Sequence, residues 1–290
     1  MTPQGRCHGL PGSARFYTRR MGDPSCTAFI GGGNMASAIL GGLLRQGAAR
    51  SAFIIVEPFE PQRDKLRADF GIGALPAADA SLARASTVIW AVKPQLFREA
   101  AAPCAAHVSR ALHLSIMAGI RSDTIVAATR SDRVVRAMPN TPALIGRGIA
   151  GLYARAGVGA ADRAEVERLL GPTGSTVWVD DEADLDAVTA LSGSGPAYVF
   201  YVIEAMAQAG VEMGLGAAQA RRLAQETLAG AAMLAIQSDE SPAVLRERVT
   251  SKGGTTHAAI TSMEDSGVKA AIVKALHAAR TRAEELGRGA

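Results

Sequence analysis

Through residue 180, short apolar runs alternate with segments of helical periodicity along the chain. The runs are rich in β-branched residues, which is typical of strands buried in a parallel sheet. They predict strands at residues 26–30, 52–57, 87–92, 112–117 and 133–138, and weaker strands at 149–154 and 176–179. Helices are predicted between them at residues 35–44, 62–70 and 161–170. The alternation predicts an α/β fold with a doubly wound parallel sheet.

The pattern changes at an acidic cluster at residues 180–184. Beyond this cluster only helical periodicity remains, and it predicts helices at residues 184–191, 197–213, 217–236, 242–249, 257–263 and 268–286. We therefore expect three parts. These are an N-terminal extension at residues 1–24, predicted to be disordered, a sheet domain at 25–180 and an all-helical domain at 181–290.

The predicted helix at residues 197–213 is apolar on nearly every side, with Tyr198, Phe200 and Tyr201 in its first turns. A helix without a polar face must be buried on all sides. Glu204 and Gln208 interrupt it, which makes it a poor membrane span. In a domain this small a second subunit supplies such burial most easily, so we expect a homodimer.

The most informative loop follows the first predicted strand, where residues 29–36 read FIGGGNMA. Gly31 permits a tight turn, and Gly33 lets the backbone approach a pyrophosphate. Asn34 precedes the next predicted helix and Met35 begins it, and the free N–H groups and positive dipole end of that helix suit phosphates. A plain glycine turn is the alternative, but a strand, a glycine turn and a helix in this order favour a dinucleotide site.

Glu57 ends the second predicted strand. An acid at this place usually bonds the adenosine ribose and discourages a 2′-phosphate, which argues for NAD. Arg63 and Lys65 follow, however, and one of them could meet a phosphate. The alternative is that Glu57 only pairs with Arg63 at the surface. The choice between NADPH and NADH is therefore open on local chemistry.

Two proline-containing loops follow later strands and are expected at the carboxyl edge of the sheet, where ligands bind. The third predicted strand ends in residues 93–95, where proline turns the chain out of the sheet, and residues 92–95 are expected to line the cofactor crevice. Asn140 lies between two prolines, and the alternative is that it only satisfies backbone groups in a rigid turn. The candidate cofactor-binding residues are Gly31, Gly33, Asn34, Met35, Glu57, Ala91, Val92, Lys93, Pro94 and Asn140.

A second candidate site is the loop at residues 250–256, which reads TSKGGTT and precedes a predicted helix. Two glycines there can turn their N–H groups toward an anion, and Lys252 adds a positive charge. The arrangement suits a small carboxylate at a helix N-terminus. An ordinary helix start with threonine capping is the alternative, and composition alone favours it. The candidate residues are Ser251, Gly254, Thr255 and Thr256.

Charge and cysteine content narrow the function classes. The net charge is +4, but residues 1–20 hold four arginines and no acid, and without them the chain has 27 basic and 27 acidic residues. No basic face is implied, so we expect no nucleic-acid partner. Three scattered cysteines lack metal or disulfide spacing, which indicates a reducing compartment and no metal. Neither a signal peptide nor a membrane span is recognisable, so we expect a cytoplasmic protein.

Side chains suited to acid–base catalysis are few. His107 and His113 fall within the predicted sheet domain and are expected to be structural or at the surface. His257 follows the second candidate loop, where a solvated helix-start histidine is the simpler interpretation. Neither a Ser/His/Asp order nor a pair of carboxylates on a motif stands out. A hydride transfer that needs little beyond a hydrogen-bond donor fits this composition.

Taken in order, five segments resemble the pyrroline-5-carboxylate reductase family, and the resemblance covers residues 26–285. The segments are residues 29–36, 91–95, 138–142, 191–198 and 249–256. The resemblance implies an N-terminal Rossmann domain and a helical dimerisation domain, in interwoven homodimers that often assemble into decamers. It also implies hydride transfer from NAD(P)H, usually NADPH, to the imine carbon of 1-pyrroline-5-carboxylate, the last step of proline biosynthesis.

The resemblance further implies roles for the second loop. Thr256 would hydrogen-bond the ring nitrogen as the catalytic donor, and Ser251, Gly254 and Thr255 would hold the carboxylate. Lys252 departs from the family pattern, in which a proline is common. Glu57 stands where a 2′-phosphate would have to be tolerated.

Two other classes of protein remain as alternatives. A related imine reductase or 3-hydroxyacid dehydrogenase could share the Rossmann half. The hydroxyacid class is expected to carry a catalytic lysine on a helix, but Lys252, Lys269 and Lys274 lie in no evident matching motif. A non-catalytic dinucleotide-sensing protein would keep the glycine loop but would have no reason to retain the second loop.

Overall fold

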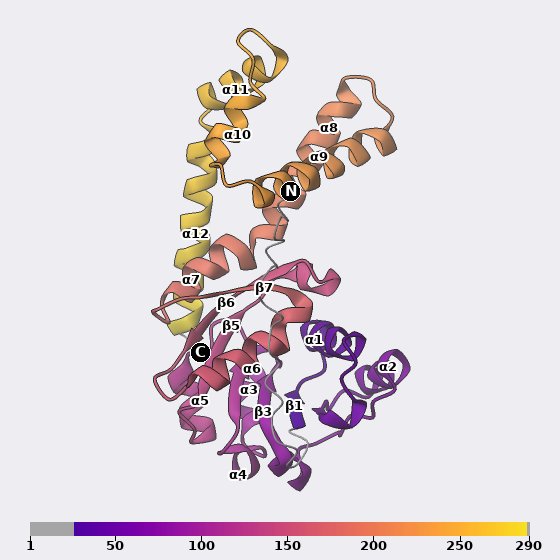
Figure 1. The fold of residues 1–290 in the computed structure, drawn as a ribbon, viewed down its shortest axis with the longest axis vertical. Helices are drawn as coiled ribbons and strands as arrows, with labels where there is room; N and C mark the ends of the chain where they lie inside the picture. Colours follow the sequence, from indigo (N-terminus) through magenta and orange to yellow (C-terminus); the bar gives the residue numbers. More distant parts are fainter. Residues whose placement is uncertain (1–25, 289–290) are drawn as a thin grey trace, which may run out of the picture.

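The computed structural model describes residues 26–288, and the extension predicted at residues 1–24 lies outside them. Seven strands form one sheet in the order β2-β1-β3-β4-β5-β6-β7 (Figure 1). Their bounds are Cys26–Ile30 (β1), Phe53–Val56 (β2), Ala85–Trp90 (β3), Leu112–Ser115 (β4), Val134–Met138 (β5), Gly148–Ala154 (β6) and Gly174–Trp178 (β7). Strands β1 to β5 are parallel, so the predicted doubly wound sheet is confirmed.

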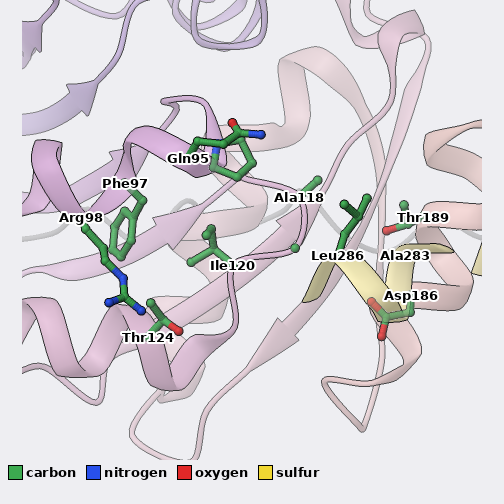
Figure 2. Close-up of a pocket in the computed structure, with 12 residues that line it drawn as sticks. Gln95, Phe97, Arg98, Ala118, Ile120, Thr124, Asp186, Thr189, Ala283 and Leu286 are labelled. Carbon is green, nitrogen blue, oxygen red and sulfur yellow. The ribbon is translucent and has the colours of Figure 1, made fainter. Parts of the chain in front are cut away.

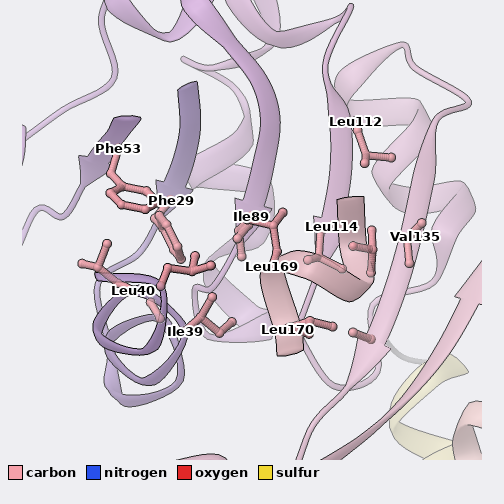
Figure 3. Close-up of a cluster of buried hydrophobic side chains, with 14 of the residues drawn as sticks. Phe29, Ile39, Leu40, Phe53, Ile89, Leu112, Leu114, Val135, Leu169 and Leu170 are labelled. Carbon is pink, nitrogen blue, oxygen red and sulfur yellow. The ribbon is translucent and has the colours of Figure 1, made fainter. Parts of the chain in front are cut away.

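Helices cover both faces of the sheet because successive strand residues point to opposite sides. On one face lie α1 (Asn34–Arg45), α2 (Glu60–Phe70) and α6 (Ala160–Leu170); on the other lie α3 (Phe97–Ala101), α4 (Ala105–Val108) and α5 (Ser122–Thr129). Figure 3 shows the first layer, where Ile39 of α1 and Leu169 of α6 pack over Phe29, Ile89 and Leu114. The opposite layer is centred on Trp90, Phe97 and Val88.

Two features of the sheet domain differ from the prediction. Strand β6 runs antiparallel to β5, although β7 is again parallel to β6. The connection from Met138 to Gly148 is too short for the crossover that a parallel strand requires. Helices α3, α4 and α5 were not predicted, since segments of 5, 4 and 8 residues are too short to show clear helical periodicity.

The chain after β7 is helical, as predicted. It forms α7 (Asp184–Val188), a π-helical turn η6 (Thr189–Gly193), α8 (Gly195–Glu212), α9 (Ala217–Gln237), α10 (Pro242–Arg248), α11 (Thr255–Asp265) and α12 (Val268–Arg288). Pro196 lies in the first turn of α8, where its missing N–H does no harm. In Figure 1, α8 and α9 form a projecting hairpin, α10 and α11 form a second arm, and α12 returns to the sheet.

Helix α8 is exposed within one subunit. Phe200 is 59% exposed and Tyr201 is 74% exposed, and Val199 and Val202 are exposed beside them. The burial on all sides expected for this helix is therefore not achieved by the chain itself. Within residues 26–288, no helix combines the length and the apolar composition that crossing a membrane requires.

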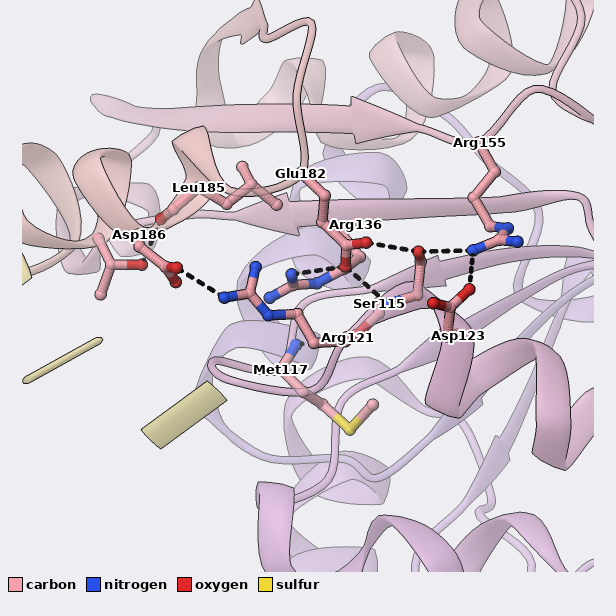
Figure 4. Close-up of polar contacts among 11 residues, drawn as sticks. Ser115, Met117, Arg121, Asp123, Arg136, Arg155, Glu182, Leu185 and Asp186 are labelled. Carbon is pink, nitrogen blue, oxygen red and sulfur yellow. Dashed lines mark hydrogen bonds and ion pairs between the residues drawn. The ribbon is translucent and has the colours of Figure 1, made fainter. Parts of the chain in front are cut away.

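Polar side chains tie the segment after β7 to the sheet (Figure 4). Glu182 accepts a hydrogen bond from Arg136 Nη1 at 2.8 Å and from the N–H and hydroxyl of Ser122 at 2.6 and 2.7 Å. Asp186 pairs with Arg121 at 2.7 Å. Burial alone would raise the pKa of Glu182, but the hydrogen bonds from Ser122 and Arg136 outweigh it and lower that pKa. The charged network thus fixes the start of the helical part on the sheet.

His113 is fully buried in β4, beside Trp90 of β3. Trp90 Nε1 donates to His113 Nδ1 at 3.1 Å, so the proton of the neutral ring lies on Nε2, which donates to the carbonyl of Val108 at 3.1 Å. Burial lowers the pKa of His113 to about 4, although the Val108 hydrogen bond opposes the shift. The expectation of a structural histidine is confirmed.

We expect the free energy of unfolding to fall as the pH drops from 7 to 5. Histidine titrates near ~6.5 in an unfolded chain, whereas folded His113 binds a proton only near about 4. The unfolded state therefore binds more protons across this window, and His113 accounts for a loss of ~2 kcal/mol. Denaturant unfolding at both pH values measures the loss, which should shrink in His113→Gln. An equal loss in that variant would contradict the assignment.

Candidate functional site

The carboxyl ends of β1 and β3 meet where the strand order reverses. After β1 the chain moves outward to β2 and then crosses to β3 on the other side of β1. Ile30 and Trp90 are register partners at the two strand ends. Open α/β sheets bind ligands in the crevice at such a switch point. The glycine loop that follows β1 therefore lies where a cofactor would be expected.

Gly31 and Gly33 have different structural roles. Gly31 has a left-handed backbone with φ 96°, and a Cβ there would lie 2.6 Å from the carbonyl oxygen of Ala91. Its N–H donates to the carbonyl oxygen of Val56 at 2.8 Å. Gly31 therefore makes the tight turn, and the close contact with Ala91 leaves no room for a side chain. Gly33 is the N-cap of α1, and a Cβ there would meet nothing within 4 Å. The open space leaves room for an anion to approach the first N–H groups of α1.

Glu57 lies directly after β2 and faces the glycine loop. Its carboxylate accepts hydrogen bonds from the N–H of Gly32 at 2.8 Å and the N–H of Phe59 at 2.9 Å. Arg63 Nη1 donates instead to the main-chain carbonyls of Glu57 at 3.2 Å and Pro58 at 2.6 Å. The alternative in which Glu57 only pairs with the Arg63 side chain is therefore wrong. Glu57 holds the loop, and Arg63 is fixed at the end of β2.

The carbonyl oxygen of Gly32 accepts hydrogen bonds from two side chains. Ser37 Oγ donates to it at 3.2 Å, and Gln62 Nε2 donates to it from α2. Neither residue was among the sequence candidates. Ser37 has a local signal, a hydroxyl in the first turn after the glycines. Gln62 has none, because its contact depends on how α2 lies over the loop.

An apolar hollow of about 270 Å³ opens beside the glycine loop. Gly31, Val56 and Val92 contribute to it from the ends of β1, β2 and β3, and Leu96 closes one side. Ligand sites commonly combine such an apolar wall with a few polar groups. The hollow and the adjacent helix N-terminus together offer a place for a flat base and a place for phosphates.

A second hollow of about 430 Å³ separates the sheet domain from the helical part (Figure 2). Gln95 and Ala118, which follow β3 and β4, line it from the sheet domain, and Leu286 of α12 lines it from the helical part. The predicted segment after β3 thus borders both hollows, through Val92 and Pro94. Lys93 between them is exposed at the surface.

Asn140 makes the contacts of the alternative that the sequence left open. Its amide donates to the carbonyl of Ser192 at 3.2 Å, and its carbonyl accepts from the N–H of Ile149 at 3.0 Å. The side chain therefore satisfies backbone groups and joins the loop after β5 to η6. These contacts support a structural role for its amide.

The loop before α11 carries the second candidate group. Gly253 has φ 75°, and the N–H of Gly254 donates to the carbonyl of Ser251 at 3.0 Å. Gly254 is the N-cap of α11, and there is no side-chain hydrogen bond that caps this end of the helix. The threonine-capped start offered as an alternative is therefore not present. Thr255 and Thr256 begin the helix, and Thr256 is half-buried. The arrangement leaves the first N–H groups of α11 for an anion.

The two candidate sites lie far apart within one subunit. Figure 1 places α11 at the opposite end of the molecule from β1. Helix α12 joins the two ends: it begins at Val268, just after α11, and its Leu286 lies against Gly119 in the loop after β4. At a rise of 1.5 Å per residue, the helix spans ~27 Å from Val268 to Leu286. The chain alone does not bring the glycine loop and Thr256 together.

Comparisons with known proteins match both halves of the chain. Residues 182–286 match a family model described as pyrroline-5-carboxylate reductase dimerisation, and residues 27–119 match one described as NADP oxidoreductase coenzyme F420-dependent. The chain is 44% identical to the pyrroline-5-carboxylate reductase of Pseudomonas aeruginosa, over 89% of this chain and 96% of that protein.

Solved structures of such reductases also match the chain. The pyrroline-5-carboxylate reductase of Coxiella burnetii matches with a TM-score of 0.85 and 32% identity, covering 91% of this chain and 99% of the other. The pyrroline carboxylate reductase of Plasmodium falciparum, solved with NADP bound, matches with a TM-score of 0.79 and 25% identity, covering 91% of this chain and 98% of the other.

Proposed function

The chain belongs to the pyrroline-5-carboxylate reductase family, and on this premise we propose that it reduces the ring imine of 1-pyrroline-5-carboxylate to L-proline. The reaction is the last step of proline biosynthesis and makes the protein an oxidoreductase that uses a nicotinamide dinucleotide. The observation that carries the proposal is the glycine loop at the β1/β3 switch point, in a chain 44% identical to a reductase over 96% of that enzyme.

The residues around the glycine loop fit a dinucleotide. The Gly33 cradle and the N-terminus of α1, which begins with Asn34 and Met35, would hold the pyrophosphate. Glu57 would face the adenosine ribose at the end of β2. Val92 and the neighbouring residues after β3 would line the parts of the site that hold the adenine base and the nicotinamide ring. When bound there, the reduced nicotinamide supplies the hydride that the imine carbon receives.

The loop before α11 would bind the substrate. Ser251, Gly254 and Thr255 would hold its carboxylate at the positive end of α11. The Thr256 hydroxyl would donate a hydrogen bond to the ring nitrogen and so draw electron density from the imine carbon, which makes that carbon a better hydride acceptor; the proton that the nitrogen gains would come from water. A threonine hydroxyl is a weak acid, so its role is to orient and stabilise. Most of the rate would come from holding the reacting atoms in line.

A complete site requires a second subunit in this proposal. Within one chain the glycine loop follows β1, whereas the substrate loop precedes α11, which lies at the opposite end of the molecule. Helix α8 also exposes an apolar surface that includes Phe200 and Tyr201. A homodimer that interleaves the helical arms would cover this surface and bring the loop of one subunit to the crevice of the other. Further assembly of dimers into a decamer, which the family resemblance implies, is tested by light scattering of the purified protein.

We expect NADPH to be the main cofactor, in line with the family resemblance, and NADH to be used as well because Glu57 disfavours a 2′-phosphate. Oxidation of each cofactor with racemic pyrroline-5-carboxylate, followed by absorbance, tests the function and the preference together. Turnover with either cofactor supports the reductase. No turnover by folded protein that binds both cofactors would refute it, and other cyclic imines and hydroxy acids would then be screened.

Replacing the Thr256 hydroxyl should slow turnover without weakening cofactor binding. We expect Thr256→Val to lower kcat about 10- to 100-fold, the value of one hydrogen bond to a charged group. Thr256→Ser keeps the hydroxyl and serves as the matched control, with most activity retained. Steady-state kinetics and a fluorescence titration with NADPH measure the two effects. Equal kcat for Thr256→Val and the wild type would remove Thr256 from the reaction.

A further inference from the structure

We propose that Gln62 is a positioning residue for the cofactor: it orients the peptide between Gly32 and Gly33 so that the Gly33 N–H faces the pyrophosphate. The inference rests on the proposed use of a dinucleotide and names a residue outside the glycine loop on which binding depends. Gln62 lies on α2, one helix away from the strand, glycine turn and helix that form the expected phosphate site.

The contact concerns the oxygen of a single peptide group. The Gly32 carbonyl accepts from Gln62 Nε2 and from Ser37 Oγ at 3.2 Å. A carbonyl only accepts, so the amide nitrogen of Gln62 is the atom that faces it. On the other side of Gly32, its N–H donates to Glu57 at 2.8 Å. Side chains from α1, α2 and the end of β2 thus hold Gly32 at both its donor and its acceptor.

Holding this carbonyl fixes the direction of the next N–H. The peptide is planar, and no cis peptide bond occurs in the described residues, so the Gly32 carbonyl and the Gly33 N–H point in opposite directions. With the carbonyl turned toward Gln62, the Gly33 N–H is turned away from it. Gly33 is exposed, and a Cβ there would meet nothing within 4 Å.

Glycine makes such a clamp necessary. A peptide between two glycines can rotate at low cost, because neither residue has a Cβ to restrict φ and ψ. Rotation would turn the Gly32 oxygen toward the phosphates and remove one donor from the site. The neutral amide of Gln62 prevents this without adding a negative charge near the pyrophosphate. A carboxylate at the same place would repel both the carbonyl oxygen and the anion.

Binding measurements on the full-length protein test the role. Gln62→Met keeps a similar length and removes the donor, and we expect the Kd for NADPH and for NADH to rise by about 3- to 10-fold each. Gln62→Glu should raise both by about 10- to 100-fold, because it adds like-charge repulsion. The melting temperature should stay close to that of the wild type, and kcat at saturating cofactor should be little changed. Asp64→Asn, an exposed change on the same helix, is the control.

Two results would overturn the inference. One is an unchanged Kd in Gln62→Met; the other is a rise confined to NADPH, which would place Gln62 at the 2′-phosphate. Ser37→Ala provides a second variant on the same carbonyl and should weaken both cofactors as well. Fluorescence titration needs no substrate, so the outcome is independent of turnover. Cofactor binding that depends on Gln62 in a protein inactive toward pyrroline-5-carboxylate would refute the proposed function alone.

Discussion

Gly31→Ala is expected to destabilise the protein strongly and to abolish cofactor binding. An alanine Cβ would lie 2.6 Å from the Ala91 carbonyl oxygen and 2.8 Å from its carbon, both of which are main-chain atoms. The residue would also have to keep φ at 96°. Backbone strain and overpacking together should lower the free energy of unfolding by ~2–5 kcal/mol. Denaturant unfolding and NADPH titration measure the two effects.

Gly33→Ala is the matched control, two residues along the same loop. Gly33 has φ −66°, and a Cβ would meet nothing within 4 Å, so the folded state should accept the methyl group with little change in stability. Only the cradle for the pyrophosphate would be narrowed, and the Kd for NADPH should rise. Equal stability of Gly31→Ala and Gly33→Ala would contradict the close approach of Gly31 to the main chain of Ala91 at this turn.

Two variants of low activity should restore activity when they are combined in one dimer. Gly33→Asp should fold, since aspartate is a favourable N-cap, but its carboxylate would occupy the anion cradle. Thr256→Val removes the hydroxyl from the substrate loop. If each site combines the crevice of one subunit with the loop of the other, a heterodimer holds one intact site and one doubly defective site. We expect about half of the wild-type activity.

Co-expression of differently tagged chains and purification through both tags yields the heterodimer. The two homodimers, prepared in the same way, set the background and should be nearly inactive. A heterodimer no more active than these would show that each site is built within one subunit, and α12 would then have to bend to bring Thr256 to the crevice. The contrast between half-activity and background makes this experiment decisive for the arrangement of the subunits.

Local patterns were sufficient for the strands and the long helices of the fold, but not for the short helices α3, α4 and α5. Strands such as those predicted at 26–30 and 87–92 were predictable because buried parallel strands are nearly continuous apolar runs, and the helices after residue 184 because their periodicity is long. Strand β6 was predicted in place, but its antiparallel direction was not. Direction depends on the length of the preceding connection and on the neighbours available, and neither appears in the periodicity of the strand itself.

The candidate site was predictable only in part. Gly31 could be named from its motif, because a tight turn between a strand and a helix needs a residue that tolerates positive φ. Asn140 was named with an open alternative, and its contacts with Ser192 and Ile149 favour the alternative. Gln62 was not named at all, because nothing near it in the sequence marks its contact with Gly32.

The sequence by itself determined the alternation of strands and helices, the glycine turn, the loop before α11 and the resemblance to a family. The first three are local, because they depend on residues within a few turns of one another, and the resemblance rests on five local segments taken in order. The tertiary structure decided that Glu57 holds Gly32 while Arg63 bonds only main-chain oxygens. It also placed α11, which begins with Thr255 and Thr256, at the opposite end of the molecule from β1. Packing between distant segments sets these relations, and no short stretch of chain encodes it.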